Sequence, residues 1–142
     1  MEDSHERVEA LLEALVARWT RAPRKRLRAS DRTLLQEVRR EFRLQLHAEE
    51  RVLYSRLLDR TPHDPAVLDG LDQHRELERW LDEIDVAEPP SEQALRKLRN
   101  LKWSAEMHFE HEEDRVFDTA RDVIDERTAE RLGLDWLRSD AA

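Results

Sequence analysis

The sequence predicts an all-α fold, an antiparallel up-down four-helix bundle with a short C-terminal helix, built as one domain over residues 1–142. Apolar residues recur at three- and four-residue steps along most of the chain, which is the period of an amphipathic helix. Charged residues make up 41% of the chain and hydrophobic residues 39%, a balance typical of helices with one solvated face. Only two glycines and five prolines are present, too few for the turns of many short strands.

Helix boundaries follow from the capping and breaking residues. Pro23 ends the first helix, and either Ser30 or Asp31 can cap the second. Asp64-Pro65 and Ser91 start the third and fourth helices, because a capping side chain precedes each apolar stripe. We therefore expect helices over residues 3–20, 31–59, 65–85, 92–123 and 128–137, joined by short loops and without an internal repeat.

Composition excludes several classes of protein. The chain has no cysteine, so disulfides, thiolate metal sites and cysteine nucleophiles are excluded. No apolar run approaches the roughly 20 residues of a membrane helix, and the first residues do not resemble a signal peptide, so we expect a cytoplasmic protein without a membrane partner. A formal net charge of −8 disfavours nucleic acid as a partner. The basic segment Arg21–Arg28 fits a solvated loop, or a docking patch for an acidic partner.

Ionisable residues occupy positions of the inward stripes where apolar residues are expected. These residues are His5, Glu49, His74, His108 and Glu112, at least one on each main helix. A buried carboxylate or imidazolium without a partner costs several kcal/mol, and one shared cation would satisfy the whole group. The pattern therefore predicts a metal site in the bundle core, with these five side chains as ligands. Taken singly, His5 fits a frayed terminus, His74 a hydrogen-bonded core histidine, and His108 with Glu112 an exposed ion pair.

Four segments of the chain resemble the helices of the hemerythrin-like, or HHE cation-binding, family. They read DSHERVEALLEAL, HAEERVLYSRL, DQHRELERWLDEI and HFEHEEDRVFDTA, and the resemblance spans roughly residues 3–120. It implies a non-haem iron site inside a four-helix bundle, usually two irons bridged by carboxylates, although imidazole–carboxylate sites also accept other divalent metals. By this resemblance His5, His74 and His108 are terminal ligands and Glu49 and Glu112 bridging carboxylates. Glu113 is a rival to Glu112, because family members differ in this spacing.

The sequence departs from the family on two helices. Gln45 stands where the family has a histidine, and His47 lies about 200° around the helix from it. His47 shares its stripe with Arg39, Arg43 and Tyr54, which we assign to the outer face; only a π-bulge would bring it to the metal. Gly70 stands four residues before His74, where oxygen carriers have a second histidine. It leaves room for water or an exogenous ligand, or it permits a tight helix crossing.

Other histidines and the tryptophans receive simpler interpretations. His111 is a replacement ligand, a hydrogen-bond donor to a ligating carboxylate or a solvated residue, and we favour the last two. His63 is expected to lie exposed in a turn. Trp19, Trp80, Trp103 and Trp136 are expected to pack in the core and the tail.

Three functions remain open from the sequence. The first is a non-haem iron protein that binds or senses oxygen, nitric oxide, peroxide or iron; the resemblance implies that it holds two irons. Because Gln45 replaces an expected ligand, reversible oxygen carriage is less expected than in the parent family. The second is a bundle with a degenerate site that serves structure or protein interaction. The third is an enzyme, for which the chain offers no nucleophile motif, phosphate loop or dinucleotide fingerprint.

Overall fold

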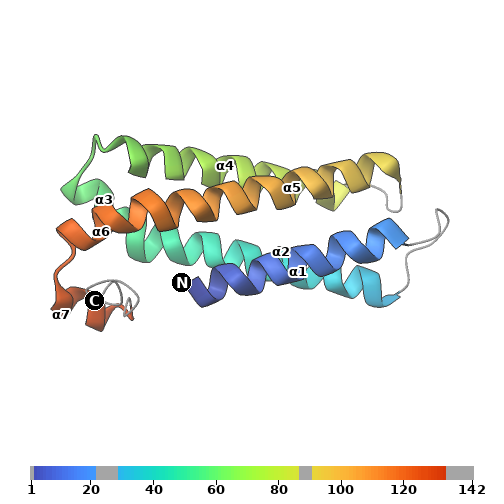
Figure 1. The fold of residues 1–142 in the computed structure, drawn as a ribbon, viewed down its shortest axis with the longest axis horizontal. Coiled ribbons are helices and arrows are strands. Elements are labelled where there is room, and N and C mark those ends of the chain that lie inside the picture. Colours follow the sequence, from blue (N-terminus) through green and yellow to red (C-terminus); the bar gives the residue numbers. More distant parts are fainter. Residues whose placement is uncertain (1, 22–28, 87–90, 134–142) are drawn as a thin grey trace.

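The computed structural model describes residues 2–21, 29–86 and 91–133, and in this part of the chain it confirms the predicted all-α bundle. Figure 1 shows long helical rods that run alternately up and down. The first rod is α1 (Glu2–Arg21). The second is α2 (Ala29–Glu49), which continues through the π-helical turn η1 (Glu50–Tyr54) into α3 (Ser55–Arg60). The third is α4 (Pro65–Val86), and the fourth joins α5 (Glu92–His111), the π-helical turn η2 (Glu112–Val116) and α6 (Phe117–Val123).

Side-chain caps set the start of several helices. The Asp64 carboxylate accepts a hydrogen bond from Ala66 N at 2.8 Å, and the Ser91 hydroxyl accepts one from Ala94 N at 3.0 Å, both as predicted. Asp125 caps the tail helix α7 (Glu126–Arg131), which therefore begins two residues before the predicted start. The described part of α2 already begins at Ala29, so neither Ser30 nor Asp31 is its N-cap. The predicted tail residues 134–137 and residues 22–28 of the basic segment lie outside the described residues.

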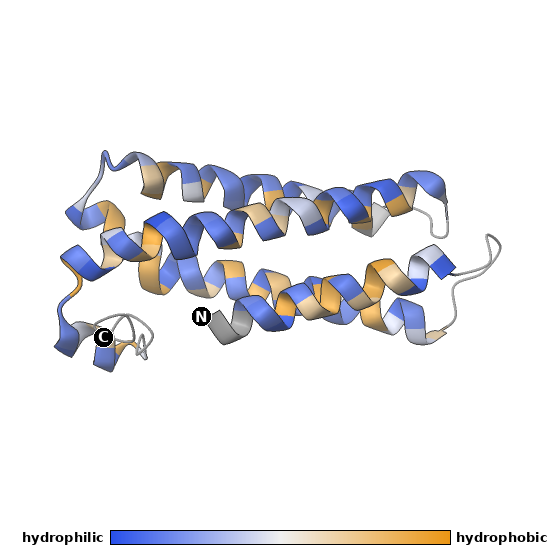
Figure 2. Cartoon of the chain, in the orientation of Figure 1, coloured by the Kyte–Doolittle hydropathy of each residue, from blue (hydrophilic) through white to orange (hydrophobic). Residues whose placement is uncertain are grey.

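The buried apolar residues form two clusters along the bundle axis. Figure 2 shows that hydrophobic and hydrophilic residues alternate along the rods, as expected of amphipathic helices. One cluster fills the end formed by most of α1, α2, α4 and α5, and the other fills the end formed by α3, α6 and the start of α4. Along the rods that contain α2, α4 and α5, a buried polar residue separates the apolar residues of one cluster from those of the other. The core is thus divided by a buried polar layer, which contains Glu49, His74, His108 and Glu112.

The exposure of the tryptophans agrees only in part with the prediction that they pack in the core and the tail. Trp19 is buried and Trp80 packs against the core, but Trp103 is 62% exposed, so its predicted core position is wrong. Trp103 lies on the outer face of α5 because its neighbours in the inward stripe, Leu101 and Ala105, already point to the core. Trp136 lies outside the described residues. No helix in the described residues combines the length and the apolar character needed to cross a membrane.

Candidate metal centre

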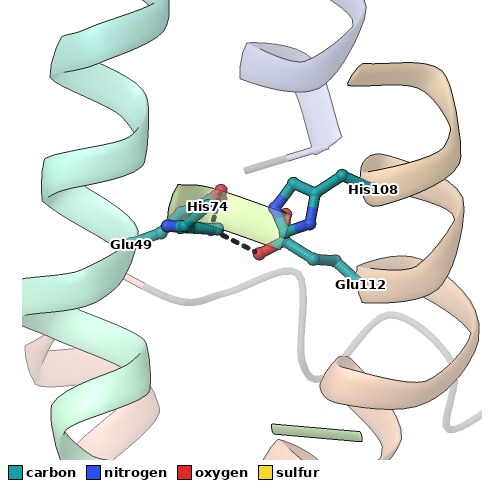
Figure 3. A group of neighbouring side chains, drawn as sticks. All are labelled: Glu49, His74, His108 and Glu112. Carbon is teal, nitrogen blue, oxygen red and sulfur yellow. Dashed lines mark ion pairs between the residues drawn. The ribbon is translucent and has the colours of Figure 1, made fainter. Parts of the chain in front are cut away.

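The five predicted ligands all lie buried, each with a relative exposure of 1% or less. Four of them, Glu49, His74, His108 and Glu112, each offer one ligand atom within 4.8 Å of the others, and they can hold a metal ion. Figure 3 shows these side chains converging from different rods of the bundle. An arrangement with nitrogen and oxygen donors on facing helices is how helical bundles build metal sites.

The two carboxylates lie between His5 and His74. The Nε2 atom of His5 is 3.1 Å from Glu112 Oε1 and 3.6 Å from Glu49 Oε2. The Nε2 atom of His74 is 3.5 Å from Glu112 Oε2 and 3.9 Å from Glu49 Oε1. Each carboxylate therefore presents one oxygen to His5 and the other to His74. His108 lies beside His74, with ring centroids 4.5 Å apart, and its Nε2 is 3.3 Å from Glu112 Oε1.

The opposite nitrogen of each imidazole is held by a further side chain. His5 Nδ1 is 3.2 Å from Glu113 Oε1, His74 Nδ1 is 3.1 Å from Glu50 Oε1, and His108 Nδ1 is 2.8 Å from Gln73 Oε1. An acceptor at Nδ1 fixes the ring orientation and leaves the Nε2 lone pair available for a metal. Glu113, the rival to Glu112, is 42% exposed and holds His5 instead of joining the buried cluster.

The atoms that face the centre lack hydrogen-bond partners. Among the described residues, the Nε2 atoms of all three histidines, both oxygens of Glu49 and Glu112 Oε1 are buried without a partner of hydrogen-bond geometry. Leaving so many polar atoms unsatisfied in a protein interior is costly, and natural cores avoid it. A cation among these atoms would satisfy all of them together, so the residues present fit a bound metal.

The electrostatics of the cluster agree with this fit. Burial and the charge of Glu112 together raise the pKa of Glu49 to about 8, although His5 and His74 act in the opposite direction. Burial opposes ionisation of Glu112, but His108, His5 and His74 outweigh it and hold its pKa well below the usual range. Burial would lower the pKa of His5, yet Glu112 and Glu49 raise it to about 10. The carboxylates thus require neighbouring positive charge, which protons or a metal cation can supply, and metal binding displaces protons.

Tyr54 is a buried residue of this site that the sequence interpretation placed on the outer face. Its side chain is 1% exposed, and its hydroxyl donates a hydrogen bond to Glu112 Oε2 at 2.8 Å. The π-helical turn Glu50–Tyr54 explains the difference, because residues five apart lie on one face of a π-helix. Tyr54 is therefore aligned with Glu49 and not with His47. The spacing Glu-Glu-x-x-x-aromatic, present at Glu49 and again at Glu112, is the sequence signal for this inward position of the aromatic ring.

The other candidate ligands lie away from the cluster. The His47 side chain is 57% exposed and its Nε2 lies 2.8 Å from Glu78 Oε1; the π turn begins after His47 and does not rotate it inward. His111 donates from Nε2 to the carbonyl oxygen of Ala66 at 2.8 Å, so it ties α5 to the start of α4, contrary to both favoured interpretations. His63 is exposed in the turn, as predicted.

Gly70 makes space for Tyr54. A Cβ at Gly70 would lie 2.9 Å from Tyr54 Cε1 and 3.0 Å from Tyr54 Cζ, closer than side chains pack. The expected room for water or an exogenous ligand is therefore filled by the phenol ring. The tight approach that glycine permits here is between a helix backbone and this ring, not between two helix backbones.

The two halves of the site correspond to each other, contrary to the expectation of no internal repeat. Gln45, Glu49, Glu50 and Tyr54 have the same spacing as His108, Glu112, Glu113 and Phe117. The correspondence extends to contacts, because Glu50 holds His74 while Glu113 holds His5. Similarly, the Tyr54 ring lies 4.8 Å from that of His74 and the Phe117 ring 5.9 Å from that of His5. The repeat escapes detection because few side chains besides the glutamates are identical.

Comparison with protein families decides the assignment. Residues 1–117 match the family described as the hemerythrin HHE cation-binding domain. The chain belongs to this family. The matched region of this HHE protein contains all five predicted ligands, and its buried glutamate–histidine cluster can hold a metal cation. Comparisons with curated proteins and with solved structures gave no match.

The hydroxyl of Tyr54 gives a first testable prediction. Tyr54→Phe keeps the ring that packs against Gly70 but leaves Glu112 Oε2 without its donor. We expect the variant to fold and to lose metal affinity by about tenfold or more, the range seen when a partner of a ligating carboxylate is removed. Competition with a chelator measures this affinity. Metal retention equal to that of the unmodified protein would show that the hydrogen bond does not orient Glu112 for binding.

Proposed function

We propose that this HHE protein is a non-haem iron protein whose core holds a carboxylate-bridged pair of irons and binds a small diatomic molecule or peroxide. His5, His74 and His108 are the terminal ligands, and Glu49 and Glu112 are the bridging ligands. One observation carries the proposal: each carboxylate directs one oxygen toward His5 and the other toward His74. That is the arrangement expected of carboxylates shared by two cations.

Bound iron would supply Lewis acidity and one-electron redox chemistry at any coordination position the protein leaves open. The chain's own residues prepare the site for it. Glu113, Glu50 and Gln73 orient the imidazoles, and Tyr54 orients Glu112. The apolar clusters on both sides of the polar layer limit access of water and so strengthen the electrostatic interactions inside it.

Metal analysis of the purified protein tests the proposal. Imidazole and carboxylate ligands also suit manganese, zinc and cobalt, so the protein is reconstituted separately with Fe²⁺, Mn²⁺, Zn²⁺ and Co²⁺. We expect close to two irons per chain and near-ultraviolet absorption bands in air. A stoichiometry of one would contradict the paired site, and retention of another metal in preference to iron would contradict the choice of iron.

His74→Ala and His108→Ala distinguish a working centre from a degenerate one. Both side chains are fully buried and adjoin both the centre and each other, so we expect each substitution to lower the bound iron below one per chain. His63→Ala, at an exposed histidine in the turn, is the matched control and should bind metal normally. If the two core variants and the control have equal metal content and equal melting temperature, the bundle serves structure or protein interaction instead.

A further inference from the structure

The outer face of α5 carries an apolar pair that the described part of the bundle leaves uncovered. Trp103 is 62% exposed and Met107 is 42% exposed, and because they lie four residues apart they are neighbours on one face of the helix. The inward side of α5 already packs against α4 and α1, so this pair faces solvent. Tryptophan and methionine are both enriched at interfaces between proteins. The pair is therefore a candidate for the centre of such an interface.

Polar residues extend the apolar pair into a stripe along the helix. Steps of four and three residues alternate along the stripe, which is the spacing by which two helices pack side by side. All its members are exposed, and we call them the α5 stripe: Arg96, Asn100, Trp103, Met107, Glu110 and Asp114. The stripe is basic at its start, apolar in the middle and acidic at its end.

The charged residues of the α5 stripe are not used within the bundle. In the part of the chain that the structure describes, no side chain forms an ion pair or hydrogen bond with Arg96, Glu110 or Asp114. By contrast, Lys102 and Glu106 beside the stripe pair with each other, with Lys102 Nζ 2.7 Å from Glu106 Oε1. The charges at both ends of the stripe are therefore available to another molecule.

The α5 stripe is complementary to itself under a twofold rotation. When two copies of α5 lie antiparallel and cross at Ala105, each residue faces the one equally far from Ala105 on the other copy. The facing pairs are Trp103 with Met107, Asn100 with Glu110, and Arg96 with Asp114. The apolar side chains then meet at the centre, and opposite charges meet at each end. A parallel arrangement would instead place like charges together at each end, which disfavours it.

We propose that the protein forms a twofold-symmetric homodimer in which the α5 stripes of two copies pack antiparallel. The inference goes beyond the proposed metal function and does not rest on it. One helix of each copy makes the contact, so the interface is small and the dimer exchanges with the single chain as the concentration changes. Both copies use the same surface, so the assembly closes at two chains.

Sedimentation velocity of the full-length protein over a range of concentrations tests the dimer. We expect the average mass to rise from 17.0 kDa towards twice that value. Trp103→Ala should raise the dissociation constant about tenfold or more, because an aromatic side chain at the centre of an interface supplies much of its binding energy. Leu44→Ala, at a leucine of α2 that is 59% exposed, is the matched control and should leave the constant unchanged. A mass of 17.0 kDa at every concentration, or equal dimerisation of Trp103→Ala and the control, overturns the proposal.

Charge reversal tests the antiparallel register at low ionic strength, where exposed charges are little screened. Arg96→Glu brings carboxylates together at each end of the dimer, and Asp114→Arg brings guanidinium groups together. Each variant alone should therefore dimerise about fivefold more weakly or worse. An equimolar mixture of the two variants should recover the dimer, because opposite charges meet again at both ends of the mixed pair.

Recovery in the mixture also shows that both variants are folded. Arg40→Glu, at an exposed arginine of α2, is the control for reversal of charge and should dimerise as the unmodified protein does. If the mixture dimerises no better than the two variants do separately, the antiparallel register is wrong and the proposal fails.

Discussion

Loading the protein with iron is expected to raise its melting temperature by on the order of 10 °C, and Glu112→Gln is expected to remove this gain. A ligand at 1,000 times its Kd stabilises a fold by about 4 kcal/mol, which corresponds to a shift of this size in a domain of this length. Glu112 contacts all three histidines and is fully buried, so its charge is central to cation binding. Glutamine keeps the size of the side chain but not its charge.

Differential scanning calorimetry with and without iron, followed by addition of a chelator, measures this effect. Glu110→Gln, an exposed glutamate of α5, is the matched control and should keep the full shift. The prediction fails if Glu112→Gln is stabilised by iron as strongly as the control. It also fails if iron stabilises neither protein, because the cluster would then not bind the metal in the folded state.

Gly70→Ala is expected to lower the free energy of unfolding by about 1–2 kcal/mol, although alanine is the better helix former. In a helix interior alanine gains about 1 kcal/mol over glycine. At this position the new methyl group would overlap the ring of Tyr54, and overpacking of a core costs about 1–3 kcal/mol. The ring must then move, and its hydrogen bond to Glu112 is lost as well.

A double-mutant cycle with Tyr54→Leu isolates this cause. The smaller leucine leaves space for the methyl group, so Gly70→Ala should become neutral or stabilising in that background. Urea denaturation of the four proteins gives the free energies. Asp69→Ala, at an exposed neighbouring position of α4, should change stability by less than about 0.5 kcal/mol. An equal loss from Gly70→Ala in both backgrounds would exclude the overlap with Tyr54 as its cause.

The sequence predicts the helical bundle well, because helix periodicity and burial are coupled. The stripe that helix periodicity predicts to face inward on the fourth rod is buried throughout; it consists of Leu98, Leu101, Ala105, His108, Glu112 and Val116. The same periodicity places His5, Glu49, His74, His108 and Glu112 in the core, and the structure brings them together. A polar residue in register with apolar neighbours points to the same interior that those neighbours fill. Assignment of the five as metal ligands stays a prediction.

Features that depend on a local change of helix period are not predicted. The turns η1 and η2 insert π-helical geometry directly after Glu49 and after His111, and α-helical periodicity then misplaces some of the residues within and beyond them. Tyr54 was assigned to the wrong face for this reason. The hydrogen bond of His111 depends on a contact between helices, which periodicity within one helix does not specify.

The five proposed ligands come from both helical hairpins of the chain. His5 and Glu49 precede the turn that contains Asp64, whereas His74, His108 and Glu112 follow it, and His5 of the first hairpin contacts Glu112 of the second. Neither hairpin alone holds a complete donor set. The affinity of the proposed site for a cation therefore depends on how firmly the two hairpins pack against each other. A substitution that loosens this packing far from any proposed ligand would weaken metal retention as well.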